Sequence, residues 1–224
     1  MSEIDAVRIR QAGTPDVIEL ARVPCPEPGE GEIRIRHAAI GVNFIDTYHR
    51  SGLYPVALPS GLGLEAAGIV DAVGPGVTAF APGDRAAYCT GPIGAYAEAH
   101  VLRADRAVRL PDGIGTDTAA AMMLKGLTVQ YLIRQIRRVG PGDTVLFHAG
   151  AGGVGQIAVQ WLKALGATVI ATAGGPEKCA LVRGLGADHV IDYRTEHIAP
   201  RVREITGGQG VPVVYDGVGR DTFE

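Results

Sequence analysis

The chain has 224 residues, enough for one or two domains with a sizeable core. Its 21 basic and 24 acidic residues give a net charge of −3 without a charged block, which argues against a nucleic-acid or membrane-surface partner. No apolar run approaches the roughly 18 residues of a membrane span, and three scattered cysteines behind an N-terminus without an apolar leader predict a cytoplasmic protein without disulfides.

The first part of the chain, to about residue 115, alternates short β-like runs with turns rich in Gly and Pro. Short strands at this spacing predict a small all-β unit or a partial barrel. A turn is expected at residues 24–29, where Gly and Pro are most dense. The expected strands are Ala6–Ile9, Glu32–Arg36, Gly68–Val73, Arg85–Tyr88 and Val101–Ala104.

The character of the sequence then changes. A helix is predicted over Thr116–Val139, with Thr116 or Asp117 as its N-cap and Gly126 as a weak point inside it. Strands and helices alternate after it, which predicts a parallel sheet with helices on both faces. The predicted strands are Thr144–Ala149, Thr168–Ala173, His189–Asp192 and Pro212–Asp216, and the helices are Val154–Leu165, Pro176–Leu185 and a segment near Thr195–Thr206 in which Pro200 delays or kinks the start.

Only four strands of this second part are visible in the sequence. A doubly wound dinucleotide fold commonly has six strands in the order 3-2-1-4-5-6, so the fourth would stand at an edge. That strand carries no lysine or other edge protection. We therefore expect the chain to be a piece of a longer protein.

Residues 145–155, VLFHAGAGGVG, contain the most informative motif, Gly150-x-Gly152-x-x-Gly155. It follows a predicted strand and opens a predicted helix. Glycines at this spacing let the chain turn, let a pyrophosphate approach the backbone and let the helix pack close to the sheet, while the helix N-terminus attracts phosphate. The motif predicts a dinucleotide cofactor and redox chemistry. The alternative is a glycine-rich turn that serves packing alone.

The end of the next strand distinguishes the two nicotinamide cofactors. NAD sites usually carry an acidic residue there, which binds the ribose 2′-hydroxyl. Here the strand ends in Thr172-Ala173-Gly174-Gly175 without an acid, and Lys178 follows. Because a carboxylate would repel a 2′-phosphate, the sequence favours NADP(H). The alternative for Lys178 is an ordinary solvated helix lysine.

Segments along the whole chain share a further pattern: AIGVNFIDTY at 39–48, RSGLYP at 50–55, GLEAAG at 63–68, GDR at 83–85, GAYAE at 94–98, LKGLT at 124–128 and YDGVG at 215–219. They resemble the quinone oxidoreductase (zeta-crystallin-like) branch of the medium-chain dehydrogenase/reductase superfamily. The resemblance implies a GroES-like β-rich catalytic domain over residues 1–125 and an α/β doubly wound Rossmann domain for NADP over 126–224, incomplete here. It also implies an active site in the cleft between them and a homodimer in the full-length protein.

Motif and resemblance together assign roles to single residues. The implied cofactor-binding set is Phe44, Ile45, Asp46, Thr47, Tyr48, Thr128, Tyr131, Gly150, Gly152, Gly153, Val154, Gly155, Gly174, Lys178, Tyr193 and Val218. Charge develops on the acceptor oxygen during reduction, so nearby donors should stabilise it, and Asn43, Tyr48 and Tyr54 are the candidate catalytic residues. Asp46 is expected to accept structural hydrogen bonds rather than to act as a base.

The sequence lacks the pattern of a metal site. Zinc alcohol dehydrogenases of this superfamily carry Gly-His-Glu and a cysteine shortly before it. Here Leu64 stands at the histidine position and Asn43 where the cysteine would be, and the four-cysteine cluster of structural zinc is missing. His148 is predicted to be a packed or hydrogen-bonded core residue rather than a ligand. We expect no metal.

Metal-free chemistry suits a quinone, which is electrophilic enough to accept hydride from NADPH once the two are held in reacting geometry. We therefore predict NADPH-dependent reduction of a quinone. Two alternatives stay open. The same fold would also reduce an α,β-unsaturated carbonyl, as an enoyl or alkenal reductase. A non-catalytic NADPH-binding protein is the other, because a fold does not guarantee turnover.

Overall fold

The computed structural model describes residues 3–219 and 222, and the chain divides between Leu124 and Lys125 into two compact units. The first unit contains an antiparallel sheet in the order β6-β3-β4-β5-β7 and a separate antiparallel pair, β1 and β2. Its elements are β1 (Glu3–Arg8), η1 (Pro15–Val17), β2 (Glu19–Pro24), β3 (Glu32–Gly41), α1 (Phe44–Ser51), β4 (Glu65–Val73), β5 (Arg85–Cys89), β6 (Ala99–Arg103), η2 (Ala104–Arg106) and β7 (Ala107–Arg109).

Alternating side chains explain the central strand of this sheet. Ile33 and Ile35 of β3 are fully buried in the core, whereas Arg34 between them donates from Nε to Asp71 Oδ1 of β4 at 2.7 Å. This period of two is the pattern of a strand with one buried face. The five predicted strands are all present, with shifted ends. The sequence did not predict β2, β7 or α1.

The short helix α1 is fixed at both ends by its own sequence. Asn43 precedes it, and the Asn43 backbone N–H donates to Asp46 Oδ2 at 2.9 Å, which satisfies a donor at the helix start. Gly52 ends the helix with φ 82°, a left-handed conformation that glycine adopts without strain. These contacts hold the residues of the candidate acceptor region on a rigid element.

A long helical run leads into the second unit. α2 (Thr116–Gln130) passes through Gly126 without a break, and a π-helical turn, η3 (Tyr131–Ile136), follows it directly. The predicted helix over Thr116–Val139 is therefore correct in type but ends three residues early. The change in hydrogen bonding lies at Tyr131, not at Gly126.

The second unit is a parallel sheet in the order β10-β9-β8-β11, the 3-2-1-4 order expected of a doubly wound fold. Each predicted strand and helix is present. The elements are β8 (Thr144–Phe147), α3 (Gly153–Ala164), β9 (Thr168–Ala173), α4 (Pro176–Gly184), β10 (His189–Asp192), α5 (Ile198–Ile205) and β11 (Val213–Tyr215). Pro200 lies in the first turn of α5, where its missing N–H costs nothing.

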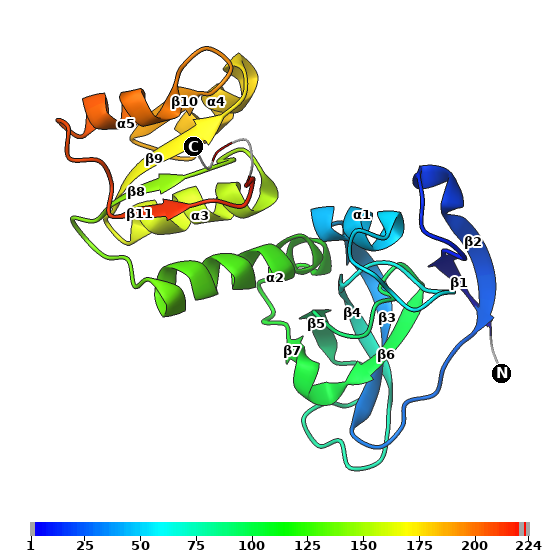
Figure 1. Ribbon diagram of the computed structural model, residues 1–224. Helices are drawn as coiled ribbons and strands as arrows, with labels where there is room; N and C mark the ends of the chain where they lie inside the picture. The colour runs from blue at the N-terminus through cyan, green and yellow to red at the C-terminus, as the bar shows by residue number, and fades with distance from the viewer. Residues whose placement is uncertain (1–2, 220–221, 223–224) are drawn as a thin grey trace. The chain divides into compact units, whose positions relative to one another are not determined.

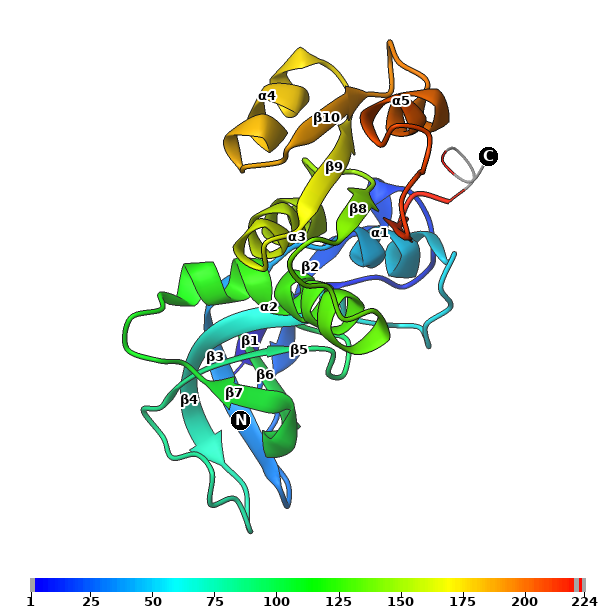
Figure 2. The ribbon, with the colours of Figure 1, turned by 90° about the vertical axis from the view of Figure 1, so that its left-hand side faces the viewer.

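Helices cover both faces of this sheet, as predicted (Figure 1). Val145 and Phe147 of β8 face a core shared with α3 and α4, while Leu146 between them faces a core shared with α5. Figure 2 shows α4 and α5 on opposite sides of β10. Among residues 3–219 and 222, no helix has the length and apolar character needed to span a bilayer.

A polar cluster lies inside the first unit, across β3, β5 and β6. His37 Nδ1 lies 2.7 Å from Ala97 O, and His37 Nε2 lies 3.0 Å from the hydroxyl of the fully buried Tyr88. His100 stacks on Tyr88 with ring centroids 6.0 Å apart. Burial lowers the pKa of His37 to about 4 and also lowers that of His100. Both imidazoles are therefore neutral in the folded protein at pH 7.

The cluster predicts acid sensitivity of the first unit. The unfolded chain protonates His37 near pH 6.5 and the folded chain only near pH 4, so stability is fully present above pH 6.5 and is lost as the pH falls toward 4. His37 alone contributes roughly 2–3 kcal/mol to this loss. Urea unfolding by circular dichroism at pH 7 and 4.5 measures it. His37→Gln should flatten the dependence, and the exposed-site control His189→Gln should not. Identical pH dependence in both variants would contradict the assignment.

Candidate functional site

The glycine motif forms the turn from β8 into α3, as predicted. Gly150 N–H donates to Thr172 O of the neighbouring strand at 2.8 Å. A Cβ on Gly155 would overlap Ala149 O and lie 2.7 Å from Gly150 Cα, so only glycine lets α3 approach the strand this closely. The left-handed residue of the turn is not one of the glycines but Ala149, with φ 53°.

The first turn of α3 presents backbone donors beside this turn. Gln156 N–H makes a helical hydrogen bond to Gly152 O at 2.8 Å. The N–H groups of Gly153, Val154 and Gly155 precede it and point beyond the helix end. Such a group of amides, with the positive end of the helix dipole, suits a phosphate.

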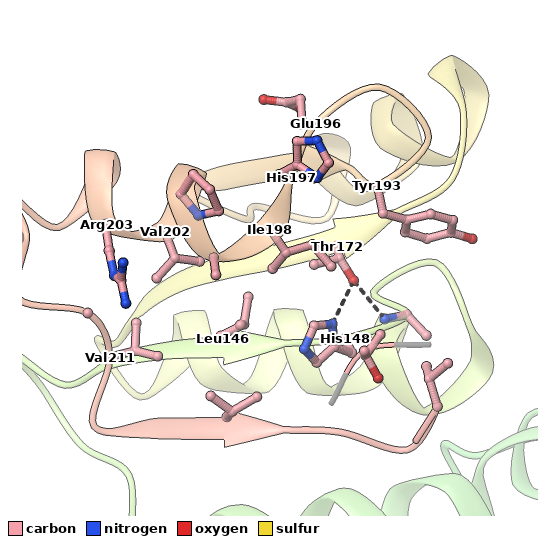
Figure 3. A pocket seen from close by; sticks show the side chains of 17 residues that line it. Leu146, His148, Thr172, Tyr193, Glu196, His197, Ile198, Val202, Arg203 and Val211 are labelled. Carbon is pink, nitrogen blue, oxygen red and sulfur yellow. Dashed lines mark hydrogen bonds between the residues drawn. The ribbon is translucent and has the colours of Figure 1, made fainter. Parts of the chain in front are cut away.

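Thr172 supports the turn from β9. Its hydroxyl oxygen lies 3.2 Å from His148 Nδ1 and 3.2 Å from Ala149 N, and Figure 3 shows both contacts. His148 is buried, and that burial lowers its pKa. The prediction of a packed, hydrogen-bonded His148 is confirmed.

The end of β9 forms a small corner with the loop after β10. A Cβ on Gly174 would overlap the Tyr193 hydroxyl, so the tyrosine lies directly over the Gly174 backbone. Lys178 lies on the exposed side of α4. The predicted residues Gly174, Lys178 and Tyr193 thus come from adjacent segments of one unit.

Arg194 is a residue of this corner that the sequence did not single out. Its Nη1 lies 3.0 Å from the ideal Cβ position of Gly175, which has φ 92° and precedes α4. One carboxylate, Asp192, holds the arrangement, because its Oδ1 accepts from Gly175 N–H at 3.0 Å and Arg194 N–H at 3.1 Å. These two amides lower the pKa of Asp192. The only sequence signal was a cation two residues after a strand end.

A hollow of about 660 Å³ is lined by residues of α5 and of the sheet, and it extends from the carboxyl ends of β8 and β9 to Gly210 and Val211, which precede β11. His148, Thr172 and Tyr193 line its strand-end part, and Ile198 and Val202 of α5 line its apolar part. Figure 3 shows Tyr193 and Arg203 at opposite ends of it. In open α/β sheets, ligands bind outside the carboxyl ends of the strands, at the point where the strand order reverses. Here the reversal lies at β8, between β9 and β11.

Three other predicted cofactor residues lie elsewhere in the second unit. Thr128 is half-buried on α2, and Tyr131 is 43% exposed at the start of η3. Val218 follows β11, and its N–H donates to Asp216 Oδ1 at 2.8 Å. Of these three residues, Val218 lines the hollow described above.

In the first unit, a chain of hydrogen bonds surrounds the start of α1. Asn43 Nδ2 donates to Glu65 Oε2 at 2.7 Å, and Glu65 Oε1 accepts from Leu124 N–H at 2.7 Å. Asp46 Oδ2 accepts from the Tyr96 hydroxyl at 2.7 Å. Burial and the Asp46 carboxylate raise the pKa of Tyr96. Asp46 is therefore a structural acceptor, as the sequence predicted, and the side chain of Asn43 is buried and already bonded.

Three predicted aromatic residues lie together beside these hydrogen bonds. The rings of Phe44 and Tyr48 meet edge to face at 5.3 Å, and those of Tyr48 and Tyr54 lie 5.1 Å apart. Phe44 is 75% exposed and Tyr54 is 48% exposed. Ile45 and Thr47, also predicted, are half-buried on α1. The first unit thus offers an exposed aromatic surface with hydroxyl groups.

The residues of the first unit do not fit a catalytic zinc. Leu64 is apolar and offers no donor atom for a metal. The side-chain N–H group of Asn43 is used in a hydrogen bond to Glu65, and an N–H group is not a metal ligand. Within the described part of the chain, no three His, Cys, Asp or Glu side chains gather in a group suited to a metal ion.

The fold and these sites define a medium-chain dehydrogenase/reductase, with a GroES-like unit followed by a nucleotide-binding unit. In agreement, residues 29–112 match the alcohol dehydrogenase GroES-like domain and residues 153–224 match the family described as zinc-binding dehydrogenase. The chain belongs to the quinone oxidoreductase family of this superfamily.

Three similar proteins document this membership. Quinone oxidoreductase of Pseudomonas aeruginosa is 58% identical over 95% of the chain and 66% of its own length. A crystal structure of Escherichia coli quinone oxidoreductase complexed with NADPH superposes with a TM-score of 0.96 at 50% identity, over 97% of this chain and 67% of that one. A 2-haloacrylate reductase of Burkholderia is 47% identical over 98% of the chain and 68% of its own length. The chain thus spans about two thirds of the length of these relatives.

The close approach at Gly155 gives a stability prediction. Gly155→Ala should destabilise the second unit by roughly 1–3 kcal/mol, because the methyl group meets backbone that cannot move aside. Thermal unfolding followed by the fluorescence of Trp161 on α3 measures this. Gly184→Ala on α4 is the matched control, since a Cβ there meets nothing within 4 Å. Equal shifts for the two variants would show that the approach is not tight.

The corner at the end of β9 gives a prediction on cofactor affinity. Lys178→Ala and Arg194→Ala should each weaken NADPH binding about tenfold, the loss of one charge-assisted contact, and change NADH binding less than about twofold. Isothermal titration with both cofactors measures the ratio. Arg106→Ala, an exposed arginine of the first unit, should leave both affinities unchanged. Equal losses for NADPH and NADH would exclude a role in reading the 2′-phosphate.

Proposed function

We propose that the protein is a metal-free, NADPH-dependent quinone reductase. The observation that carries this is the hydrogen bond of 2.7 Å from Asn43 Nδ2 to Glu65 Oε2, because it engages the residue that stands where zinc-dependent members of the superfamily have a cysteine. Without a Lewis acid, the acceptor must itself be electrophilic, and quinones are. The P. aeruginosa and E. coli relatives named quinone oxidoreductase support the choice.

We propose that the second unit holds the cofactor. The amides of Gly153 and Val154 would bind the pyrophosphate, and Lys178, Tyr193 and Arg194 would surround the 2′-phosphate. When bound, the nicotinamide supplies a hydride. Gly155 lets α3 approach the strand closely and Gly174 lets the Tyr193 ring lie over the backbone, and a side chain at either position would prevent this. Both contacts support the assignment, as does the E. coli structure complexed with NADPH.

The first unit is then the catalytic domain. Phe44 and Tyr48 would hold the flat acceptor ring by stacking and edge contacts. The hydroxyls of Tyr48 and Tyr54 are the proposed donors to the oxygen on which charge develops. Asn43 stays a candidate donor, but its bond to Glu65 favours a positioning role, because it fixes the start of α1.

Two further properties belong to the same proposal. We infer a homodimer in the complete protein from the family resemblance. A cytoplasmic location is supported by Cys25, Cys89 and Cys179, all of which are buried free thiols. Light scattering of the purified protein tests the dimer.

One alternative has an observation of its own. The Burkholderia relative is named for reduction of a 2-haloacrylate, whose carbon–carbon double bond is conjugated to a carboxyl group. An aromatic surface with two tyrosine hydroxyls also suits such an acceptor. The same residues would then stabilise an enolate oxygen rather than a quinone oxygen.

Comparing acceptors tests the proposal. The purified protein should oxidise NADPH with 1,4-benzoquinone far above the uncatalysed background and turn over an enone and 2-chloroacrylate much more slowly. Phe44→Ala should raise KM for the quinone roughly tenfold by removing an exposed aromatic contact, and Leu20→Ala, equally exposed on β2, is its control. Turnover of the alkenes alone would favour the alternative. NADPH binding without any turnover would favour a non-catalytic protein.

A further inference from the structure

Two polar atoms on α1 have no use in the proposed site. Asp46 Oδ1 and His49 Nδ1 are buried without a hydrogen-bond partner among the described residues. Both side chains are more than nine-tenths buried, at 4% and 8% exposure. A buried polar atom without a partner destabilises the folded state, so two on one eight-residue helix require an explanation.

The two atoms lie on one face of the helix. Residues three apart on a helix are neighbours, with Cβ atoms about 5–6 Å apart. Asp46 cannot turn its carboxylate freely, because Oδ2 accepts from the Asn43 N–H at 2.9 Å and from the Tyr96 hydroxyl at 2.7 Å. Its second oxygen therefore stays on the side away from these donors, still requiring a donor.

The chemistry of the two groups is complementary. A carboxylate oxygen only accepts, so it needs an N–H or O–H, and a histidine ring nitrogen supplies one when it carries the proton. The two atoms are not hydrogen-bonded to each other. A proton on His49 Nδ1 would satisfy both atoms through one water between them. Nε2 is then the ring nitrogen left without a proton. Unlike Nδ1, Nε2 is not one of the buried atoms that lack a hydrogen-bond partner.

The surroundings of His49 point toward the aromatic surface. The ring of Tyr54 lies 6.2 Å from that of His49, and Tyr54 N–H is tied to Tyr48 O of α1 at 3.1 Å. Arg50, the nearest cation in the sequence, donates from Nε to Gly13 O at 3.1 Å. The groups described around His49 are thus Asp46 with Tyr96 behind it, and Tyr54.

We propose that His49 and Asp46 form a proton-relay couple that supplies, through Tyr54, the proton needed to complete reduction of the acceptor. This rests on the proposed function. Through this bridging water, Asp46 would hold His49 Nδ1–H and stabilise the imidazolium, so that Nε2 exchanges protons with solvent on one side and serves Tyr54 on the other. His49 is a positioning and relay residue here, and Tyr54 is the group that touches the acceptor.

The step balances. Hydride addition brings two electrons to the quinone and leaves a hydroquinone monoanion. The Tyr54 O–H bond breaks as its proton passes to the hydroquinone oxygen. A proton from solvent adds to the bare Nε2 of His49, and the tyrosinate then takes this proton, which leaves His49 in its Nδ1–H form. The sum is quinone, NADPH and one proton giving hydroquinone and NADP⁺, and no further oxidant or reductant is needed.

The tautomer of His49 tests the couple without any turnover. In ¹⁵N-histidine-labelled protein at pH 8, the His49 signal, assigned by its loss in His49→Gln, should show a protonated Nδ1 and an unprotonated Nε2. The reverse tautomer would overturn the couple, because a bare Nδ1 cannot donate to the bridging water. This measurement is independent of quinone reductase activity.

Kinetics tests the relay. His49→Gln should lower kcat with 1,4-benzoquinone by about 10- to 100-fold, within the usual range for loss of acid–base assistance, and leave NADPH affinity unchanged. Added imidazole should restore part of the rate, which a merely structural loss would not permit. His49→Phe, which keeps the ring volume, should behave in the same way, and the exposed-site control His189→Gln should match the wild type.

The outcomes separate the two proposals. Wild-type kcat in His49→Gln, or a loss that imidazole does not relieve in either variant, overturns the relay and leaves the proposed function standing. A wild-type protein that reduces neither quinone nor enone overturns the proposed function and the relay with it. The tautomer measurement would then still decide whether Asp46 and His49 are coupled.

Discussion

The first unit depends on one buried carboxylate. Glu65 is fully buried at the start of β4, and its two oxygens accept from Asn43 Nδ2 and from Leu124 N–H at 2.7 Å each. A buried carboxylate is costly unless its oxygens are satisfied. The partners of Glu65 tie the strand to the start of α1 and to α2. Glu65 therefore helps to fix the aromatic and polar residues of the candidate acceptor region. A shift of the start of α1 would break the hydrogen bond from Asn43 and leave a buried carboxylate oxygen without that donor.

The second unit uses carboxylates differently. Asp192 stands at the end of β10, close to the corner that we assign to the 2′-phosphate, where an unpaired negative charge would oppose binding. Its Oδ1 is occupied by two backbone amides, those of Gly175 and Arg194. The same bonds hold the Arg194 backbone beside Gly175. The acidic residue Asp192 thus shapes the corner through its hydrogen bonds, while Lys178 and Arg194 provide the positive charge that would attract a phosphate.

Sequence periodicity predicted the second unit well and the first unit less well. Buried parallel strands and amphipathic helices carry strong local patterns, so each element from β8 to β11 was predicted within a few residues. α1 was missed because its eight residues, FIDTYHRS, mix aromatic and polar side chains. The pair Asn43 and Asp46 at capping-box spacing was the available signal. β2 alternates weakly and is mostly exposed, and β7 has three residues, too few for a pattern.

The candidate site divides in the same way. Glycines and strand ends are local features, so Gly155 and Gly174 were predicted from the sequence pattern, whereas Tyr193 was predicted only from the family resemblance. Arg194 was not, because its approach to Gly175 depends on how two strands pair. The unpartnered atoms of Asp46 and His49 were equally out of reach, since burial of both on one helix face requires the tertiary structure. Sequence patterns locate motifs, whereas packing decides which polar atoms lack a partner.

Strand β9 links two parts of the proposed nucleotide site that lie at different points along the chain. Thr172 holds Ala149, the left-handed residue of the glycine turn, and two residues later Gly174 receives the Tyr193 ring. Because successive side chains alternate between faces, a slip of one residue in the pairing of β9 would displace both contacts together. The pairing register of β9 therefore fixes both contacts at once. It sets the distance between the glycine turn and the corner at Gly174, the two parts of the site that we propose for the phosphates of the cofactor.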